Sequence, residues 1–377
     1  YYSVEVCYAG LNDSNHPETR LRKDLLPSDY HRFNRPVRDR TTVIFVKYFA
    51  GLYQLVGFNS QEQSIQLLIF QNITWHDEFL KWNPANYSGI EKIRIPQYSV
   101  WMPDVLLYTE IGNLDYLKFY YIAPLLVNYG GNVSWSQPMN IETTCSMDVT
   151  NFPFDSQTCE IAMGSWQYTT AEMRMSCDNE LNLDAYIPDS LWDLKGASCH
   201  ERFMDNYSDA VITVTFKRLQ TFFVVNLVIP TVLLLGISSL TFFIPGEIGE
   251  KLSYGVTVTL SLCVNLTIFT IFIPMTSKTF PKLFTYFLST IVLSCVSMVL
   301  ATVSVNFVNI SRNSKNEDEF AAFKSPFTDM ELNKLANRVC SNKTKMTRLR
   351  KIDSVIGFIY FLGVTIYSVA FFMLMSR

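Results

Sequence analysis

Charged residues are scarce in this sequence, and the scarcity is concentrated in its second half. Asp, Glu, Lys and Arg make up 17% of the 377 residues and hydrophobic residues 49%, an apolar balance for a soluble protein. Four stretches contain no charged residue: 222–244, 252–275, 283–311 and 354–376. Each is long enough to cross a bilayer core, which takes about 20 helical residues. Four such runs in one chain predict membrane spans rather than buried core helices.

Histidine is scarcer still, with four in the chain, and they form no metal-binding cluster. The sequence also has no Gly-rich phosphate loop and no nucleophile motif. The net charge of -3 argues against a basic surface for nucleic acid. We therefore expect no catalytic residue, metal or cofactor, and a membrane enzyme with a sensor domain becomes the disfavoured alternative.

Two signals indicate the orientation of the four spans. Basic residues cluster before the fourth span, and such clusters favour the cytoplasm; they are Lys343, Lys345, Arg348, Arg350 and Lys351. Four glycosylation sequons precede the first span, consistent with a secreted side; they begin at Asn72, Asn86, Asn132 and Asn206. With four spans, both the N-terminal domain and the C-terminus are expected outside the cell.

The first 218 residues predict a short helix followed by many strands. Pro17 suits the first turn of a helix over residues 18–26. Later runs such as 42–48, 64–75 and 211–216 are rich in β-branched and aromatic residues. Short strands separated by turn residues indicate an immunoglobulin-like, all-β sandwich, which we expect to be the extracellular domain.

Five cysteines lie in this half, which indicates an oxidising compartment. Cys145 and Cys159 enclose 13 residues, with the sequence Phe-Pro-Phe-Asp at 152–155 in the centre. This stretch closely resembles the signature loop of the Cys-loop receptors, the pentameric ligand-gated ion channels. The resemblance implies a Cys145–Cys159 disulfide and an apolar tip resting on the membrane domain. The bond before Pro153 can be cis, although trans is the more frequent state.

The remaining cysteines suggest one more bond. Cys177 and Cys199 are expected to pair, since the strands that they end could lie side by side. Cys7 would then be left without a partner in this half.

The resemblance covers nearly the whole chain. Residues 101–104 (Trp-Met-Pro-Asp) look like the family's WxPD motif, with Tyr108 at the family's spacing. Residues 164–166 look like the segment carrying the central tryptophan, and 207–209 match the end of the mobile binding loop. The resemblance implies a principal face of Tyr108, Trp166 and Tyr207, with Phe70 on the opposite subunit face. Such an aromatic cage attracts an organic cation by up to about 2 kcal/mol when desolvated.

Aromatic residues in a β-sandwich mostly pack in the core. We expect that role for Trp75, Trp82 and Trp101. The loop 199–207 lacks the adjacent cysteines of nicotinic principal subunits and has His200 where those receptors place a tyrosine. Phe203 could supply the missing wall of the cage. His200 could titrate near neutral pH, but a solvated loop histidine is the preferred interpretation.

The second span contains a stripe spaced by three or four residues, which places its members on one helix face. The stripe is Glu250, Ser253, Thr257, Leu260, Val264, Ile268 and Ile271. Apolar stripes usually indicate helix packing. Residues 249–251 and Pro274, however, match the family's second span without a gap, which implies pore lining.

The resemblance assigns a role to each part of this stripe. Glu250 would form a carboxylate ring that attracts cations at the inner mouth, with Glu247 adding charge nearby. Leu260, Val264 and Ile268 would form an apolar constriction. Lys251 is adjacent, but one residue along a helix turns it about 100° away from Glu250.

The expected domain map follows: residues 1–218 form the extracellular domain, 219–310 three membrane helices, 311–353 a cytoplasmic loop with an amphipathic helix, and 354–377 the fourth span. We expect a plasma-membrane homopentamer that conducts monovalent cations, contacts membrane lipids and opens on binding a small ligand such as a cationic amine. An anion-selective channel of the same family, and a subunit needing partner subunits, are the alternatives. The four apolar spans argue against a soluble ligand-sequestering protein.

Overall fold

The computed structural model describes residues 16–27, 30–111, 123–245, 250–273, 280–323 and 329–375, with residues 311–323, 329–346 and 349 described by their helical backbone. Cys7, Glu247 and Pro274 lie outside the described residues. The chain divides into two compact units. One contains Tyr1–Met147 and Ser156–Lys217, and the other contains Asp148–Asp155 and Arg218–Arg377.

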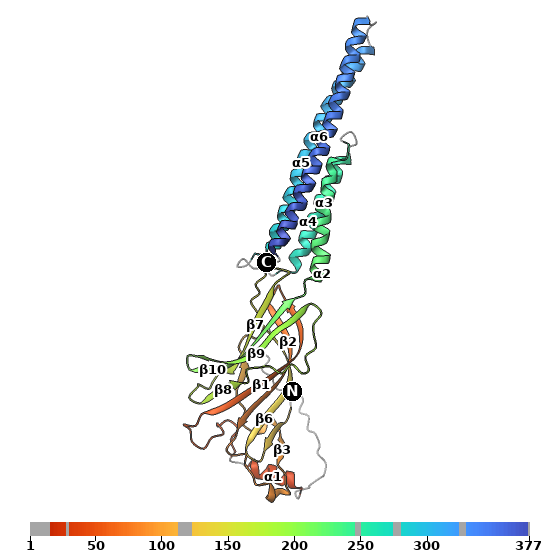
Figure 1. Cartoon of the computed structure of the whole chain (residues 1–377). Helices are drawn as coiled ribbons and strands as arrows, with labels where there is room; N and C mark the ends of the chain where they lie inside the picture. The colour runs from red at the N-terminus through yellow and green to blue at the C-terminus, as the bar shows by residue number, and fades with distance from the viewer. Residues whose placement is uncertain are drawn as a thin grey trace, which may run out of the picture. The chain divides into compact units, whose positions relative to one another are not determined.

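The first unit contains the helix α1 (Pro17–Leu25), which Pro17 begins as expected, and the strands of two sheets (Figure 1). In chain order the strands are β1 (Ile44–Asn59), β2 (Ser64–His76), β3 (Lys92–Ile95), β4 (Val105–Leu107), β5 (Leu125–Asn128), β6 (Asn132–Thr144), β7 (Ser156–Ser165), β8 (Met173–Cys177), β9 (Trp192–Met204) and β10 (Tyr207–Arg218). Short 3₁₀ turns lie at Pro84–Tyr87 and Gln97–Ser99.

The two sheets form the predicted sandwich. One has the strand order β3-β5-β6-β2-β1-β8 and the other β4-β7-β10-β9. Alternate residues of β2 are buried, among them Ile65, Leu67 and Ile69, and they join one core with residues of β7 and β10. The run predicted at 42–48 is only the start of the long strand β1. Bulges beside Leu52 and Leu55 interrupt the alternation of side chains in its later half.

Two disulfides connect strands of the first unit. Cys145, directly after β6, is bonded to Cys159 in β7. Cys177, at the end of β8, is bonded to Cys199 in β9. The peptide bond before Pro153 is cis.

The second unit is helical. Its first span comprises α2 (Thr221–Phe223), a π-helical turn (Val224–Val228), α3 (Ile229–Ser238) and a 3₁₀ turn (Ser239–Phe242). The change from π to α geometry occurs beside Pro230, which has no backbone N–H to donate. The other helices are α4 (Glu250–Ile271), α5 (Lys282–Phe323) and α6 (Asp329–Met375).

Four segments of these helices are long and apolar enough to cross a membrane: Thr221–Phe242, Glu250–Ile271, Lys282–Ile310 and Arg350–Met375. The last two belong to the longer helices α5 and α6, which continue side by side past the ends of α3 and α4 (Figure 1). The helix predicted before the fourth span is therefore the first part of α6, without a break between the two.

The centre of the loop closed by Cys145 and Cys159 packs within the helical unit. Phe152 is fully buried, with its ring centroid 4.9 Å from that of Phe223 and 5.6 Å from that of Phe269. Arg218 donates two hydrogen bonds to Asp155, at 2.8 and 3.1 Å, and its guanidinium lies over the Phe152 ring. The expected contact of the loop tip with the helices is present.

Candidate functional site

Three of the predicted aromatic residues converge in the four-stranded sheet. Tyr108 follows β4, Trp166 follows β7 and Tyr207 begins β10. Since β7 pairs with both β4 and β10, the three residues come from adjacent strands. They line a hollow of about 480 Å³ together with Ser165, Met204, Asp205 and Asp209. The ring centroids of Tyr108 and Trp166 are 6.3 Å apart.

Asp104 holds the turn that carries Trp166. Its carboxylate accepts hydrogen bonds from the backbone N–H groups of Trp166 and Gln167, at 3.2 and 2.8 Å, and from the Ser165 hydroxyl. The Trp166 side chain is 70% exposed, so its position depends on this backbone turn rather than on packing. Asp104 belongs to the WxPD stretch, but no role was predicted for its side chain. The sequence carried no local signal for this contact, because Asp104 and the turn that it holds are more than 60 residues apart.

Buried polar groups lie behind the aromatic rings. Asp209 is almost fully buried and pairs with Arg202 at 3.2 Å, while the Tyr108 hydroxyl donates to the carbonyl of Ser165 at 2.9 Å. Burial first, and then the charge of Asp209, raise the pKa of Tyr108, which keeps this hydroxyl protonated. A Cβ added at Gly164 would overlap both the Tyr108 hydroxyl and the Asp209 carboxylate, so any larger residue there would displace these side chains.

The β9–β10 hairpin closes one side of the hollow. Its two-residue turn has Asp205 in the left-handed region, with φ of 51°. The carbonyl of Asn206 in this turn accepts a hydrogen bond from Thr170 N–H at 2.7 Å. The hairpin tip is thereby joined to the segment that follows Trp166.

Two predicted residues do not line the hollow. His200 and Phe203 are exposed on β9, and Met204 with Asp205 provides the wall instead. The exposure of His200 agrees with a solvated histidine, and Phe203 is offset by one residue from Met204, so the two side chains point to opposite faces of the strand. Phe70 lies in β2 of the other sheet, where its ring is 6.4 Å from that of Tyr53. It is therefore away from the three aromatic residues within one chain.

The tryptophans expected in the core are there. Trp75 and Trp101 are buried, with ring centroids 6.1 Å apart, and Trp101 Nε1 donates to the Tyr168 hydroxyl at 3.3 Å. Trp82 is half-buried and donates to the carbonyl of Ile90 at 2.6 Å.

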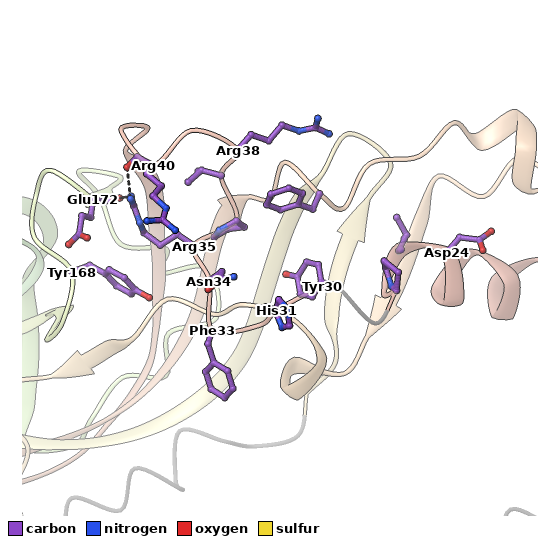
Figure 2. A pocket seen from close by; sticks show the side chains of 15 residues that line it. Asp24, Tyr30, His31, Phe33, Asn34, Arg35, Arg38, Arg40, Tyr168 and Glu172 are labelled. Atoms are coloured by element: carbon purple, nitrogen blue, oxygen red, sulfur yellow. Dashed lines mark hydrogen bonds between the residues drawn. The ribbon is translucent and has the colours of Figure 1, made fainter.

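A larger hollow, of about 640 Å³, lies beside α1 and the segment that follows it. Figure 2 shows Arg35, Arg40 and Glu172 gathered at one end, with Phe33 pointing away. The guanidinium of Arg35 donates to the backbone carbonyls of Thr42, Arg40 and Glu172. Its hydrogen bonds therefore hold these backbone segments together. We therefore take the aromatic hollow as the candidate binding site.

Among the described residues, no group of three or more His, Cys, Asp or Glu side chains could hold a metal ion.

The helix α4 has two distinct faces within the helical unit. Every member of the predicted stripe is exposed: Glu250, Ser253, Thr257, Leu260, Val264, Ile268 and Ile271. The opposite face is buried against neighbouring helices: Lys251, Gly255, Val258, Leu262, Asn265 and Phe269. Leu260 is 62% exposed and Leu262, two residues later, is 2% exposed. The stripe is therefore the face of α4 that its own chain leaves uncovered.

Polar contacts orient the buried face of α4. The Asn265 amide donates to the carbonyl of Leu227 at 3.2 Å and contacts the Thr231 hydroxyl. Thr259 and Ser294 are hydrogen-bonded through their hydroxyls at 2.8 Å. Because buried polar groups lose free energy without partners, these contacts disfavour rotation of α4 about its axis.

The predicted glycosylation sites differ in exposure. Asn86, Asn132 and Asn206 are exposed. Asn72 is half-buried in β2, where its side-chain oxygen accepts a hydrogen bond from the Ser134 hydroxyl at 2.8 Å. Carbohydrate at these four positions stays a prediction.

Comparison with known proteins shows two family matches. The model of the neurotransmitter-gated ion-channel ligand binding domain matches residues 18–220, and that of the neurotransmitter-gated ion-channel transmembrane region matches residues 227–356. The two matches lie on the β-sandwich and on the helical unit.

Curated relatives are similar over most of the chain. Acetylcholine receptor subunit beta-like 1 of Drosophila melanogaster is 30% identical over 79% of this chain and 58% of its own length. Acetylcholine receptor subunit alpha-like 2 of Drosophila melanogaster is 31% identical over 78% and 53%. Neuronal acetylcholine receptor subunit alpha-4 of Gallus gallus is 31% identical over 81% and 50%. The chain spans about half the length of the curated relatives that it matches.

Proposed function

The chain belongs to the neurotransmitter-gated ion-channel family, and from this premise we propose that it is a subunit of a pentameric, cation-selective channel opened by a small cationic ligand. It has the four membrane-spanning helices and the extracellular sandwich of a plasma-membrane receptor. Five copies of the subunit would surround the pore, and the ligand would bind between neighbouring copies.

The exposed stripe of α4 is the observation that carries the proposal. Lipid can cover an exposed apolar face, but this stripe also contains a carboxylate and hydroxyl groups, which favour a water-filled pore. Glu250 begins the stripe, hydroxylated residues follow, and apolar residues complete it. Five such stripes around an axis would produce a carboxylate ring that attracts cations and an apolar ring that closes by dewetting. No Lys or Arg occurs on the stripe to oppose the carboxylates.

The aromatic hollow supports a cationic ligand. Exposed Trp166 and the rings of Tyr108 and Tyr207 present electron-rich faces, and Asp205 adds a carboxylate to the lining. A desolvated cation gains about 2 kcal/mol from such faces. Phe70 of a neighbouring copy would supply the remaining wall, since its own chain holds it in the other sheet.

A ligand must favour one arrangement of the channel in order to open it. The loop closed by Cys145 and Cys159 joins the end of β6 to β7. Its central Phe152 packs on helical residues, including Phe269 of α4. We propose that this loop, together with the segment 276–282, carries the ligand's preference to the pore helix. Residues 276–279 of that segment lie outside the described residues.

The direct test is current recorded from the subunit expressed alone in oocytes, while amines, amino acids and protons are screened. Trp166→Ala should abolish or greatly weaken activation while surface expression persists. Phe33→Ala is the matched control, because Phe33 is an exposed aromatic residue outside the hollow. If Trp166→Ala responds like wild type, the proposed pocket is wrong. If wild type reaches the surface and passes no current, the subunit needs partner subunits.

The reversal potential under a salt gradient tests selectivity. The wild-type current should reverse near the equilibrium potential of the permeant cation, because a carboxylate ring concentrates cations and repels anions. Glu250→Ala should shift the reversal potential toward that of chloride, while Glu250→Asp, which keeps the charge, should not. A wild-type value near the chloride potential would refute cation selectivity. A normal value in Glu250→Ala would move the filter elsewhere, with Glu247 as the next candidate.

A further inference from the structure

A positive charge lies buried beside the proposed carboxylate ring. Lys251 follows Glu250 directly, yet its side chain has no exposed surface, whereas Glu250 is exposed. The Lys251 ammonium lies 2.9 Å from a carboxylate oxygen of Asp353, which comes from α6. The Ser304 hydroxyl, from α5, donates to the same oxygen at 2.6 Å. Three helices therefore meet at one ion pair, whose partners are 102 residues apart in the chain.

This ion pair bears on the charge of the inner mouth. Charges in a medium of low dielectric act over longer distances than charges in water. An unpaired Lys251 would oppose the potential of the neighbouring Glu250 in every subunit. With Asp353 beside it, the lysine is compensated, and each subunit retains the net negative charge of Glu250.

We propose that Asp353 is a determinant of charge selectivity, because it neutralises Lys251 and so lets the Glu250 ring set the potential at the inner mouth. The inference rests on the proposed function and deepens it. It assigns part of the selectivity to α6, a helix that contributes no residue to the stripe. Asp353 acts through Lys251 and is a positioning residue for charge, not a contact of the permeating ion.

A purely structural role makes a different prediction. Breaking a buried pair by removing one partner is destabilising, whereas replacing both partners with neutral groups is often tolerated. A structural pair would therefore alter assembly without moving the selectivity of those channels that reach the surface. Electrostatic compensation moves selectivity in surviving channels, and in opposite directions for the two partners.

The experiment compares reversal potential and single-channel conductance in variants of the full chain. Asp353→Asn should shift the reversal potential toward that of chloride and lower the conductance. The double variant Lys251→Met with Asp353→Asn should restore both values, because only Glu250 then remains charged. Asp329→Asn is the matched control. It makes the same change on the same helix, about 36 Å away at 1.5 Å per residue, well beyond a Debye length of about 8 Å.

Several outcomes would overturn the inference. An unchanged reversal potential and conductance in Asp353→Asn would do so, as would a double variant that stays as defective as the single one. If Asp353→Asn fails to reach the surface, Lys251→Met tests the inference instead. Lys251→Met leaves the Asp353 carboxylate as an additional negative charge beside the mouth, so it should increase cation conductance. An unchanged conductance would reject compensation.

Failure of the proposed function would look different. It would be visible in wild type, as a reversal potential near that of chloride. Failure of this inference leaves wild type cation-selective.

Discussion

The aromatic hollow and the pore-facing stripe both present exposed side chains, but they are held in place by different means. In the hollow, Trp166 and Tyr108 come from separate segments and are positioned by polar contacts, since Asp104 binds the turn of Trp166 and the Ser165 carbonyl accepts from the Tyr108 hydroxyl. On α4, the stripe is aligned by the helical repeat alone, and the neighbouring helices decide only which face they bury. Single changes behind the hollow should therefore be more damaging to ligand response than single changes on the stripe.

The largest effect is expected at Gly164. In Gly164→Ala the added methyl group would overlap the Tyr108 hydroxyl and the Asp209 carboxylate, and would displace the Tyr108 ring from its place beside Trp166. Overpacking costs about 1–3 kcal/mol. Since about 1.4 kcal/mol corresponds to a tenfold change in affinity, the ligand concentration for half-maximal current should rise by roughly 10- to 100-fold.

Gly196→Ala is the control for that change. Gly196 lies in β9 of the same sheet, and a Cβ there would meet nothing within 4 Å. Equal responses in the two variants would mean that the space behind Tyr108 does not control the hollow.

A smaller effect is expected at Asp104. Asp104→Asn keeps the size of the side chain but replaces one accepting oxygen with a donor, which weakens its hold on the Trp166 turn. Hydrogen bonds to charged groups contribute about 1.5–3 kcal/mol, and part of this loss should appear as a rise in half-maximal concentration of about tenfold. Asp39→Asn is the control, since Asp39 also accepts a turn N–H, from Thr41, away from the hollow. Matching dose–response curves for these two variants would assign Trp166 another support.

The smallest change, and in the opposite direction, is expected on the stripe. Leu260→Thr should let water persist in the closed constriction, so that the channel opens at lower ligand concentration or spontaneously. Leu262→Thr places the same hydroxyl on the buried face, where it should reduce surface expression instead. A normally closing Leu260→Thr channel would show that the constriction lies higher, at Val264 or Ile268.

Prediction from sequence succeeded where a pattern is local. The four spans, the helix beginning at Pro17 and the alternation along β2 each depend on residues close together in the chain. Prediction was weaker along the hairpin of β9 and β10. There, Phe203 was offered as a possible wall of the cage, whereas the fold of the strand turns Met204 toward the hollow within one chain.

The resemblance in the WxPD stretch located Asp104 without explaining it. Its carboxylate binds backbone groups more than 60 residues later in the chain, and no local repeat carries that information.

By itself, the sequence determined the division into a β-rich half and four apolar spans, and it determined the stripe on α4. The spacing of apolar residues and the length of an apolar run depend on residues that are close in the chain, so both can be read without knowing tertiary contacts. Only the tertiary structure decided that Asp104 holds Trp166, that Gly164 makes room for Tyr108, and that Asp353 compensates Lys251. These contacts join residues far apart in the chain, and their energies arise only when folding removes water from between them.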